Sequence, residues 1–248
     1  MRNIKLILEY DGSRYNGWQR LGKEDNSGTI EAKLLEVIKK MSGEDVELNC
    51  AARTETGVHA HGQVVNFKTA SPMKLYEIKN YLNRYLPMDI AVIDIEEKPE
   101  RFHASLNAKS ITYLYRISIG DVPSVFERKY MYYCFKKPDA DKMRIAAKDL
   151  LGKHDFKCFS TVKKAKSTEK VIDSIDIYED SNEIQITITA NQFLHNMARM
   201  IIGTLLDIGC GNRPITDVKQ ILSGNGTVTA SAPAKTQGLF LENAAYDK

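Results

Sequence analysis

The spacing of apolar and polar residues predicts both strands and helices along this chain. Apolar residues alternate with polar ones over 111–119 and 184–190, a period of two that is typical of strands with one buried face. From Thr29 to Gly43 the apolar residues instead recur at helical spacing, and the glycine marks where a helix would stop. The chain is therefore expected to mix the two kinds of element.

The first 108 residues are expected to hold four strands and two helices. The expected strands are 4–9, 46–51, 63–67 and 90–95, and the expected helices are 29–42 and 73–85. Pro87 ends the second helix, because the residue before a proline is disfavoured in the helical region. The order β-α-β-β-α-β is that of the ferredoxin-like split fold, in which helices cover one face of an antiparallel sheet.

Residues 109–248 resemble this order with an insertion. The expected strands are 111–119, 130–135, 171–178, 184–190 and 238–242, and the expected helices are 140–151, 193–208 and 215–222. We therefore predict an α+β protein with two ferredoxin-like halves, 1–108 and 109–248, whose largely antiparallel sheets meet at a central cleft. The free sheet faces of such a cleft suit an extended ligand.

Composition and charge limit the possible classes of protein, but they do not identify the function. The chain has 248 residues, of which 43% are hydrophobic and 27% charged, as is typical of a globular protein. Its 35 Lys and Arg against 32 Asp and Glu give a net charge of +3, which is compatible with a nucleic-acid partner but does not identify one. The sequence shows neither a long apolar run nor a signal-peptide core, so we expect a cytoplasmic protein without a membrane segment.

The sequence carries no strong signal for a metal or a cofactor. The four cysteines lie far apart without a CxxC pair, and His59-Ala60-His61 alone is a weak metal signal. A dinucleotide fingerprint and a phosphate-binding loop are also missing from the sequence. We therefore predict no metal and no cofactor, so that catalysis would depend on carboxylate chemistry.

A polar loop at 51–60 is the first candidate for a functional site. It lies between the expected strands 46–51 and 63–67, which would hold its ends while the backbone between them stays free to shape a site. Arg53 and Glu55 are its charged residues. We expect binding and chemistry to depend on this pair.

Arg199 is the second candidate, since it interrupts the apolar helix expected at 193–208. A buried guanidinium costs several kcal/mol unless a carboxylate and further hydrogen bonds compensate. An acidic group is therefore expected opposite Arg199. The alternative is that Arg199 lies at a domain interface and reaches solvent or a backbone carbonyl.

Several segments resemble the tRNA pseudouridine synthase A family (TruA). Residues 52–60, Ala-Arg-Thr-Glu-Thr-Gly-Val-His-Ala, are similar to the signature Gly-Arg-Thr-Asp-x-Gly-Val-His-Ala, with Glu55 in place of the catalytic aspartate and Ala52 in place of glycine. Residues 191–203 resemble the family segment N-x-F-x-x-x-M-x-R-x-x-x-G, whose arginine, here Arg199, pairs with the catalytic carboxylate. Further matches span nearly the whole chain: 10–12, 17–20, 102–104, 112–115, 150–156 and 238–241.

The resemblance implies roles for further residues. Tyr113 would contact the target base and Leu239 would form an apolar shelf for it, although the pattern alone favours core packing for Tyr113 and a buried strand for Leu239. The expected RNA-binding residues are Arg20, Arg53, His59, Tyr113 and Leu239. The expected catalytic residues are Glu55, Tyr113 and Arg199.

The resemblance implies an isomerase that converts uridine to pseudouridine in the anticodon stem-loop of tRNA, without a cofactor and as a homodimer. Glu55 would do the covalent or proton-abstracting work, Arg199 would keep the carboxylate ionised, and the uridine would have to leave the base stack. An alternative is a family member that binds structured RNA without catalysis, because Glu55 is one methylene longer than aspartate. We expect a functional enzyme with a retracted loop. Ala52 points to this, because alanine restricts the backbone before Arg53 more than the family's usual glycine would.

Two further departures from the family pattern concern charge. Ser105 follows Phe102-His103-Ala104 where the family usually has arginine, and 109–111 also lack the arginine often found before the tyrosine. Both remove positive charge from a surface expected to meet phosphate, so RNA affinity or choice of substrate would differ.

Overall fold

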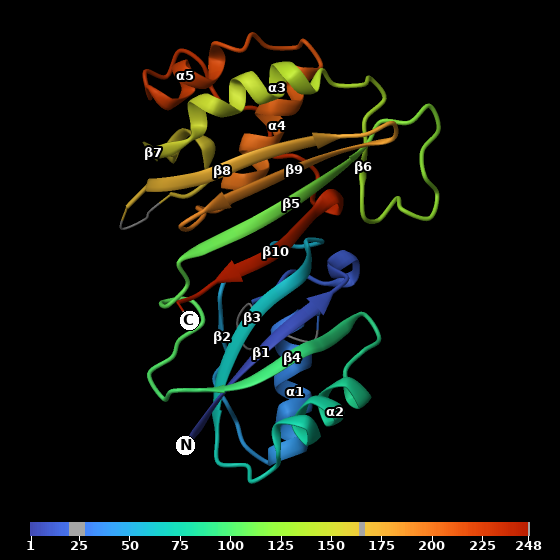
Figure 1. The fold of residues 1–248 in the computed structure, drawn as a ribbon, viewed down its shortest axis with the longest axis vertical. Helices are drawn as coiled ribbons and strands as arrows, with labels where there is room; N and C mark the ends of the chain where they lie inside the picture. Colours follow the sequence, from blue (N-terminus) through green and yellow to red (C-terminus); the bar gives the residue numbers. More distant parts are fainter. Residues whose placement is uncertain (20–27, 164–166, 248) are drawn as a thin grey trace. The chain divides into compact units, whose positions relative to one another are not determined.

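The computed structural model describes residues 1–19, 28–163 and 167–247. These residues form two compact units: unit 1, from Met1–Lys109 together with the chain from Phe240 onward, and unit 2, from Ser110–Leu239 (Figure 1). The predicted α+β fold class with largely antiparallel sheets is confirmed. The meeting of the two halves at a cleft stays a prediction.

The sheet of unit 1 is built around its first strand. Its strands are β1 (Arg2–Tyr10), β2 (Asn49–Cys50), β3 (His59–Thr69), β4 (Ile90–Lys98) and β10 (Leu239–Ala245). Strand β1 pairs antiparallel with β3 on one side and with β4 on the other, while β3 carries β2 and β10 along its second edge. With its two helices, the order β1-α1-β2-β3-α2-β4 is the predicted ferredoxin-like order.

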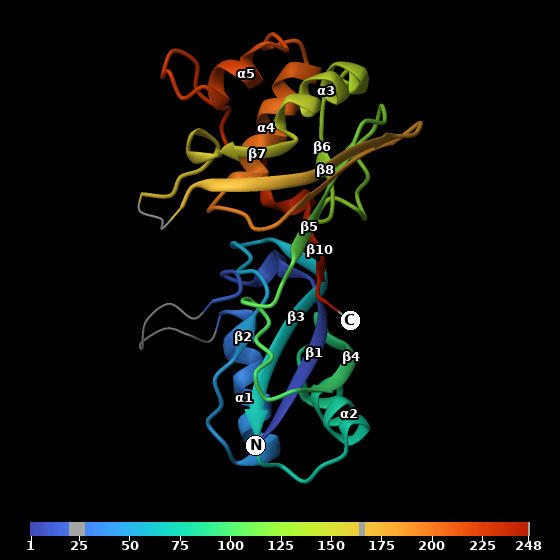
Figure 2. The same ribbon diagram turned by 60° about the vertical axis from the view of Figure 1, so that its left-hand side comes forward.

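The two helices of unit 1 complete its core. Helices α1 (Ile30–Ser42) and α2 (Leu75–Tyr85) pack against each other, and α2 packs against β4 (Figure 2). Thr29 begins α1, because its hydroxyl oxygen accepts a hydrogen bond from the Ala32 amide at 3.3 Å. Fully buried apolar side chains from β1, α1 and α2 meet in this core: Ile4, Leu6, Leu8, Ile30, Leu34, Ile38, Ile78 and Leu82.

Two boundaries in unit 1 differ from the prediction. The strand expected at 46–51 is reduced to Asn49–Cys50, because only these two residues pair with β3. Strand β3 begins at His59, four residues earlier than expected, since Ala60 already pairs with Tyr10 across a register shift in β1. The loop between β2 and β3 is therefore 51–58, shorter than the predicted 51–60.

The last strand joins unit 1 rather than unit 2. The division predicted after residue 108 placed 238–242 in the second half of the chain. In the structure the chain from Phe240 onward belongs to unit 1, because Phe240 and Leu241 of β10 pair with His59 and Ala60 of β3.

The strands of unit 2 form a mostly antiparallel sheet. Its strands are β5 (Ser110–Ser118), β6 (Tyr132–Tyr133), β7 (Gly152–Asp155), β8 (Glu169–Glu179) and β9 (Glu183–Ala190). The order is β5-β9-β8-β7, and β6, much shorter than the expected 130–135, pairs in parallel with the end of β5. The alternation predicted for β9 is confirmed, since Ile184, Ile186 and Ile188 are fully buried. Strand β7 was not predicted, because its sequence Gly-Lys-His-Asp has no apolar alternation.

Three helices lie on one side of this sheet in both views (Figures 1 and 2). They are α3 (Ala140–Ala147), α4 (Met197–Gly209) and α5 (Asp217–Leu222), and α3 packs against both α4 and β8. Helix α4 begins four residues later than predicted, because Asn196 has a φ of 62°, outside the right-handed helical region. Within the described ranges, no helix is both long enough and apolar enough to cross a membrane.

Candidate active site

The loop 51–58 of unit 1 is held at its start by a buried glutamine. The Ala51 amide donates to the Val64 carbonyl of β3 at 2.8 Å, and the Gln63 side-chain amide donates to the Ala52 carbonyl at 2.6 Å. Gln63 itself is fully buried. The position of the loop relative to β3 is therefore fixed before the chain reaches Arg53.

The middle of the loop is clamped onto the segment that follows β1. Thr54 is buried, and its hydroxyl lies 2.8 Å from the Tyr10 hydroxyl, while its carbonyl accepts from the Trp18 amide at 3.0 Å. Gly17 makes this approach possible: its φ is 81°, and a Cβ there would lie 2.6 Å from the Thr54 carbonyl oxygen. Burial raises the pKa of Tyr10 far above its ordinary value, so this phenol stays a neutral partner of Thr54.

A tight turn then carries the chain past Glu55. The Val58 amide donates to the Glu55 carbonyl at 3.1 Å, and Gly57, with a φ of 77°, occupies the turn position that requires a positive φ. With Thr54 directed inward, Arg53 is exposed and Glu55 is half-buried. The loop thus presents Arg53 to solvent and holds the half-buried Glu55 on a fixed backbone.

Ala52 within the loop and Cys50 just before it both affect the chemistry that the loop can carry out. Ala52 has no left-handed backbone, since Asn196 is the one non-glycine residue with positive φ in the described ranges, so alanine fits there without strain. Burial raises the pKa of the Cys50 thiol to about 12, which keeps it protonated. The carboxylate of Glu55, not this thiol, is therefore the candidate reactive group.

His59 directly follows the loop, as the first residue of β3, and is only 1% exposed. The Gly12 amide donates to its Nδ1 at 3.1 Å, and Asp11 Oδ1 lies 3.2 Å from the same nitrogen. Its ring stacks on Phe240 at 4.8 Å. These contacts join β3, β10 and the chain after β1, so any contact of His59 with RNA stays a prediction.

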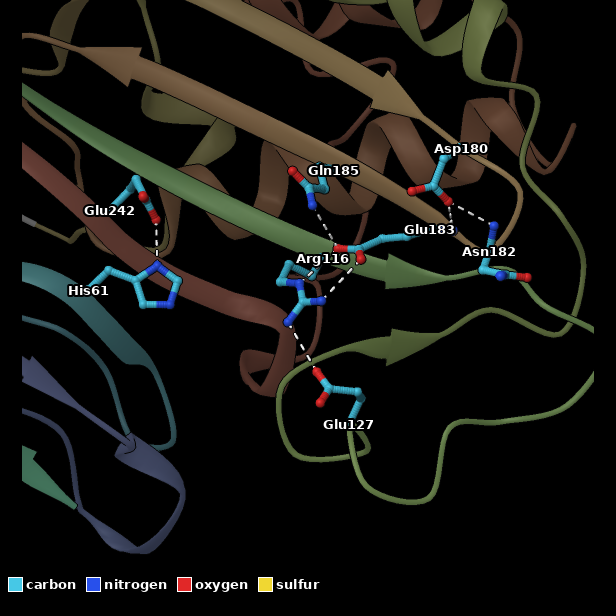
Figure 3. A network of polar contacts seen from close by, with 8 residues as sticks. All are labelled: His61, Arg116, Glu127, Asp180, Asn182, Glu183, Gln185 and Glu242. Atoms are coloured by element: carbon cyan, nitrogen blue, oxygen red, sulfur yellow. Dashed lines mark hydrogen bonds and ion pairs between the residues drawn. The ribbon is translucent and has the colours of Figure 1, made fainter. Parts of the chain in front are cut away.

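His61, two residues further along β3, is half-exposed and pairs with β10. Its Nδ1 lies 2.7 Å from Glu242 Oε2 (Figure 3). Its ring stacks on Phe240 at 4.6 Å. In the part of the chain that the structure describes, no group of three or more His, Cys, Asp or Glu side chains could hold a metal ion.

In unit 2, Arg199 lies in the first turn of α4 and is half-buried. Its Nε donates to the Ala234 carbonyl at 2.6 Å, and its Nη1 donates to Asn196 Oδ1 at 2.9 Å. The predicted helix 193–208 would have placed Arg199 deeper inside the helix. Because α4 starts at Met197, the guanidinium lies near the helix end, where it can reach a backbone carbonyl.

Tyr113 and Leu239 are mostly buried, as their patterns indicated. Tyr113 on β5 is 8% exposed and meets Phe193 edge to face at 4.9 Å. Leu239, the first residue of β10, is 3% exposed. Only a small part of each side chain could therefore touch a base.

Arg116, further along β5, is already neutralised by carboxylates. Its Nε and Nη2 donate to the two carboxylate oxygens of Glu183 at 2.7 and 3.0 Å, and its Nη1 donates to Glu127 at 3.2 Å (Figure 3). Such a fork holds β5 to β9 and to the segment before β6. This arginine is thus a structural cation, poorly suited to bind phosphate.

The expected site residues are divided between the two units. Unit 1 holds Arg53, Glu55 and His59, whereas unit 2 holds Tyr113, Arg199 and Leu239. Arg20 lies outside the described residues. The pairing of Glu55 with Arg199 joins residues of different units and stays a prediction.

A family model described as tRNA pseudouridine synthase matches residues 6–106 and 146–247. This chain belongs to the tRNA pseudouridine synthase family. The resemblance seen in the sequence is thereby confirmed, and with it the isomerase class. The matched residues include the loop with Glu55 and helix α4 with Arg199.

Relatives within the tRNA pseudouridine synthase family match over nearly the whole chain. A tRNA pseudouridine synthase A 2 of Bacillus anthracis is 41% identical over 99% of this chain and 100% of its own. A tRNA pseudouridine synthase A of Clostridium kluyveri is 40% identical with the same coverage. A chain from a solved structure of an H/ACA RNP bound to a substrate RNA is 10% identical, with a TM-score of 0.36 over 95% of this chain and 46% of that one.

Proposed function

We propose that this protein isomerises uridine to pseudouridine in the anticodon stem-loop of tRNA, with Glu55 as the reactive carboxylate. The observation that carries the proposal is the position of Glu55: a half-buried carboxylate on a loop held by buried hydrogen bonds, in a member of this family. A carboxylate on a fixed backbone is suited to attack or to proton abstraction.

The reaction exchanges one bond of the nucleoside for another. The C1′–N1 bond breaks, the base turns, and a C1′–C5 bond forms, after which C5 loses a proton and N1 gains one, so that no oxidant or reductant is needed. Glu55 would act either by forming a covalent bond to the substrate or by removing a proton. Exposed Arg53, two residues before Glu55, would hold a phosphate or enter the space left by the flipped uridine.

Residues of unit 2 would complete the site. Arg199 would stabilise the ionised form of Glu55, and Tyr113 and Leu239 would contact the flipped base with their small exposed parts. This assignment follows the family segments and requires that α4 and the loop 51–58 meet around the substrate. Crosslinking of Cys substituted at 55 and 199 would test that requirement: no crosslink with short reagents, with and without tRNA, would contradict it.

Substitutions at Glu55 test the proposal directly. Native protein, Glu55→Asp and Glu55→Gln are compared on a tRNA transcript, with pseudouridine scored by mass spectrometry. We expect native activity, a loss of about three orders of magnitude or more in Glu55→Gln, and a loss of up to about a hundredfold in Glu55→Asp, since a shift near 1 Å matters in a shaped site. An inactive native protein that still binds tRNA tightly would support the alternative, an RNA-binding relative without catalysis.

We also propose that the protein works as a homodimer in the cytoplasm. Four large apolar side chains between β5 and β6, or just after β6, are strongly exposed and would be covered by a partner: Val122, Val125, Phe126 and Phe135. Light scattering at micromolar concentration should give about twice the 28.0 kDa mass of one chain. A mass near one chain would contradict the dimer and leave the proposed chemistry standing.

A further inference from the structure

Asn196 has an unusual backbone for a non-glycine residue. Its φ and ψ are 62° and 4°, and it is the one residue other than glycine with a positive φ in 1–19, 28–163 and 167–247. This left-handed conformation costs free energy for any residue with a Cβ, although asparagine tolerates it better than most. Such a conformation persists only where its surroundings hold it in place, and it often marks a functional site.

The side chain of Asn196 is oriented by its neighbours. A guanidinium can only donate, so the amide oxygen must face Arg199 Nη1, at 2.9 Å. The amide nitrogen then faces Thr161, donating to its hydroxyl oxygen at 2.8 Å. The Thr161 hydroxyl lies 2.6 Å from His195 Nδ1, to which it can donate in turn. This chain of hydrogen bonds fixes which way the amide points.

Arg199 is thereby held from two directions. Asn196 holds Nη1 from the start of α4, and the Ala234 carbonyl holds Nε from the segment before β10. The Ala234 amide also donates to the Arg199 carbonyl at 2.9 Å, so that segment is tied to α4 at the same residue. Two fixed acceptors on different nitrogens leave the guanidinium plane little freedom to rotate.

We propose that Asn196 is a positioning residue, which accepts the strained backbone in order to orient the Arg199 guanidinium. The inference rests on the proposed function, in which Arg199 stabilises the Glu55 carboxylate. Asn196 touches no substrate in this role. In this left-handed conformation the amide oxygen of Asn196 lies within hydrogen-bond distance of Arg199 Nη1, at 2.9 Å.

Three substitutions separate positioning from simple stability. Asn196→Gly removes the amide and relieves the backbone strain, Asn196→Ala removes the amide and keeps the strain, and Asn196→Ser keeps a neutral acceptor for Arg199. We expect kcat to fall about 10- to 100-fold in the Gly and Ala variants and to stay within about threefold of native in the Ser variant. The KM for tRNA should change by less than about threefold in all three, because the proposed role of Asn196 is to orient another side chain.

Stability should follow a different order from activity. The melting temperature of the Gly variant should equal or exceed that of the native protein, while that of the Ala variant should fall. Asn182→Gly, at an exposed position between β8 and β9, is the matched control and should leave kcat unchanged. A merely structural role would make kcat follow the melting temperature.

The outcomes distinguish this inference from the proposed function. A Gly variant with native kcat, or a Ser variant as impaired as the Gly variant, would overturn the positioning role while the active native protein upholds the proposed function. A native protein without activity on tRNA would contradict the proposed function and this inference together. Loss of kcat in the Gly variant with full stability and native KM would support both.

Discussion

At the scale of single residues, Gln63 links three parts of the site with one fully buried amide. Its nitrogen donates to the Ala52 carbonyl at 2.6 Å and lies 3.4 Å from the Tyr10 hydroxyl, so it joins β3 to the loop 51–58 and to β1. Removing a buried partner leaves the other group unsatisfied, which costs more than the hydrogen bond contributes when formed.

We therefore expect Gln63→Leu to lower the free energy of unfolding by about 1–3 kcal/mol and to reduce kcat as well. Gln185→Leu is the matched control, because Gln185 is half-buried and its side chain donates to the neighbouring Glu183 carboxylate at 3.1 Å. Urea unfolding of the two variants, together with the tRNA assay, measures both effects. Equal, small losses of stability would show that the buried amide does not hold the loop.

At the scale of elements, the loop 51–58 depends on how closely the segment after β1 can approach it. Gly17 and Gly43 both have positive φ, 81° and 75°, but only at Gly17 would a Cβ meet backbone, 2.6 Å from the Thr54 carbonyl oxygen. At Gly43 a Cβ would meet nothing within 4 Å. An alanine would therefore strain the backbone at either position, but only at Gly17 would its Cβ also collide with another part of the backbone.

Gly43→Ala should cost about 1 kcal/mol of stability and leave kcat unchanged, since it strains only the end of α1. Gly17→Ala should cost at least about 1 kcal/mol more and lower kcat about tenfold or more, because the loop must move away from Trp18. Thermal unfolding and the tRNA assay compare the pair. A Gly17→Ala protein that matches Gly43→Ala in both would contradict the clamping of the loop.

The elements also show what the sequence could and could not predict. Strands β1, β5, β8 and β9 and helices α1 and α2 follow strong apolar periods, so their existence was predicted correctly. The start of strand β3 was missed because His59 is polar yet buried, and its contacts are with residues far along the chain. The late start of α4 depends on the φ of Asn196, which no local pattern reveals, and this also explains why Asn196 was missed as a candidate.

At the scale of the whole molecule, Phe240 shows that the end of the chain supports unit 1. Its ring is 5% exposed and stacks on both His59 and His61. Phe240→Ala should lower the stability of unit 1 by about 3–5 kcal/mol, whereas Met88→Ala, at a fully exposed position of the same unit, should change stability by less than about 0.5 kcal/mol. In the Phe240→Ala protein, hydrogen exchange should show faster opening of β3 while the amides of β8 and β9 keep their protection. An equal loss of amide protection in both units would contradict the assignment of Phe240 to unit 1.

The pairing of β10 with β3 also sets an order of events during synthesis. Residues 1–109 leave the ribosome first, but β10, which lies beside His59 and Ala60, is made only after all of unit 2. Until then this stretch of β3 is an open strand edge, the kind of surface that recruits foreign strands. A nascent chain halted before residue 239 should therefore be more prone to aggregation through β3 than the finished protein, and a chaperone that covers strand edges would act during the translation of unit 2.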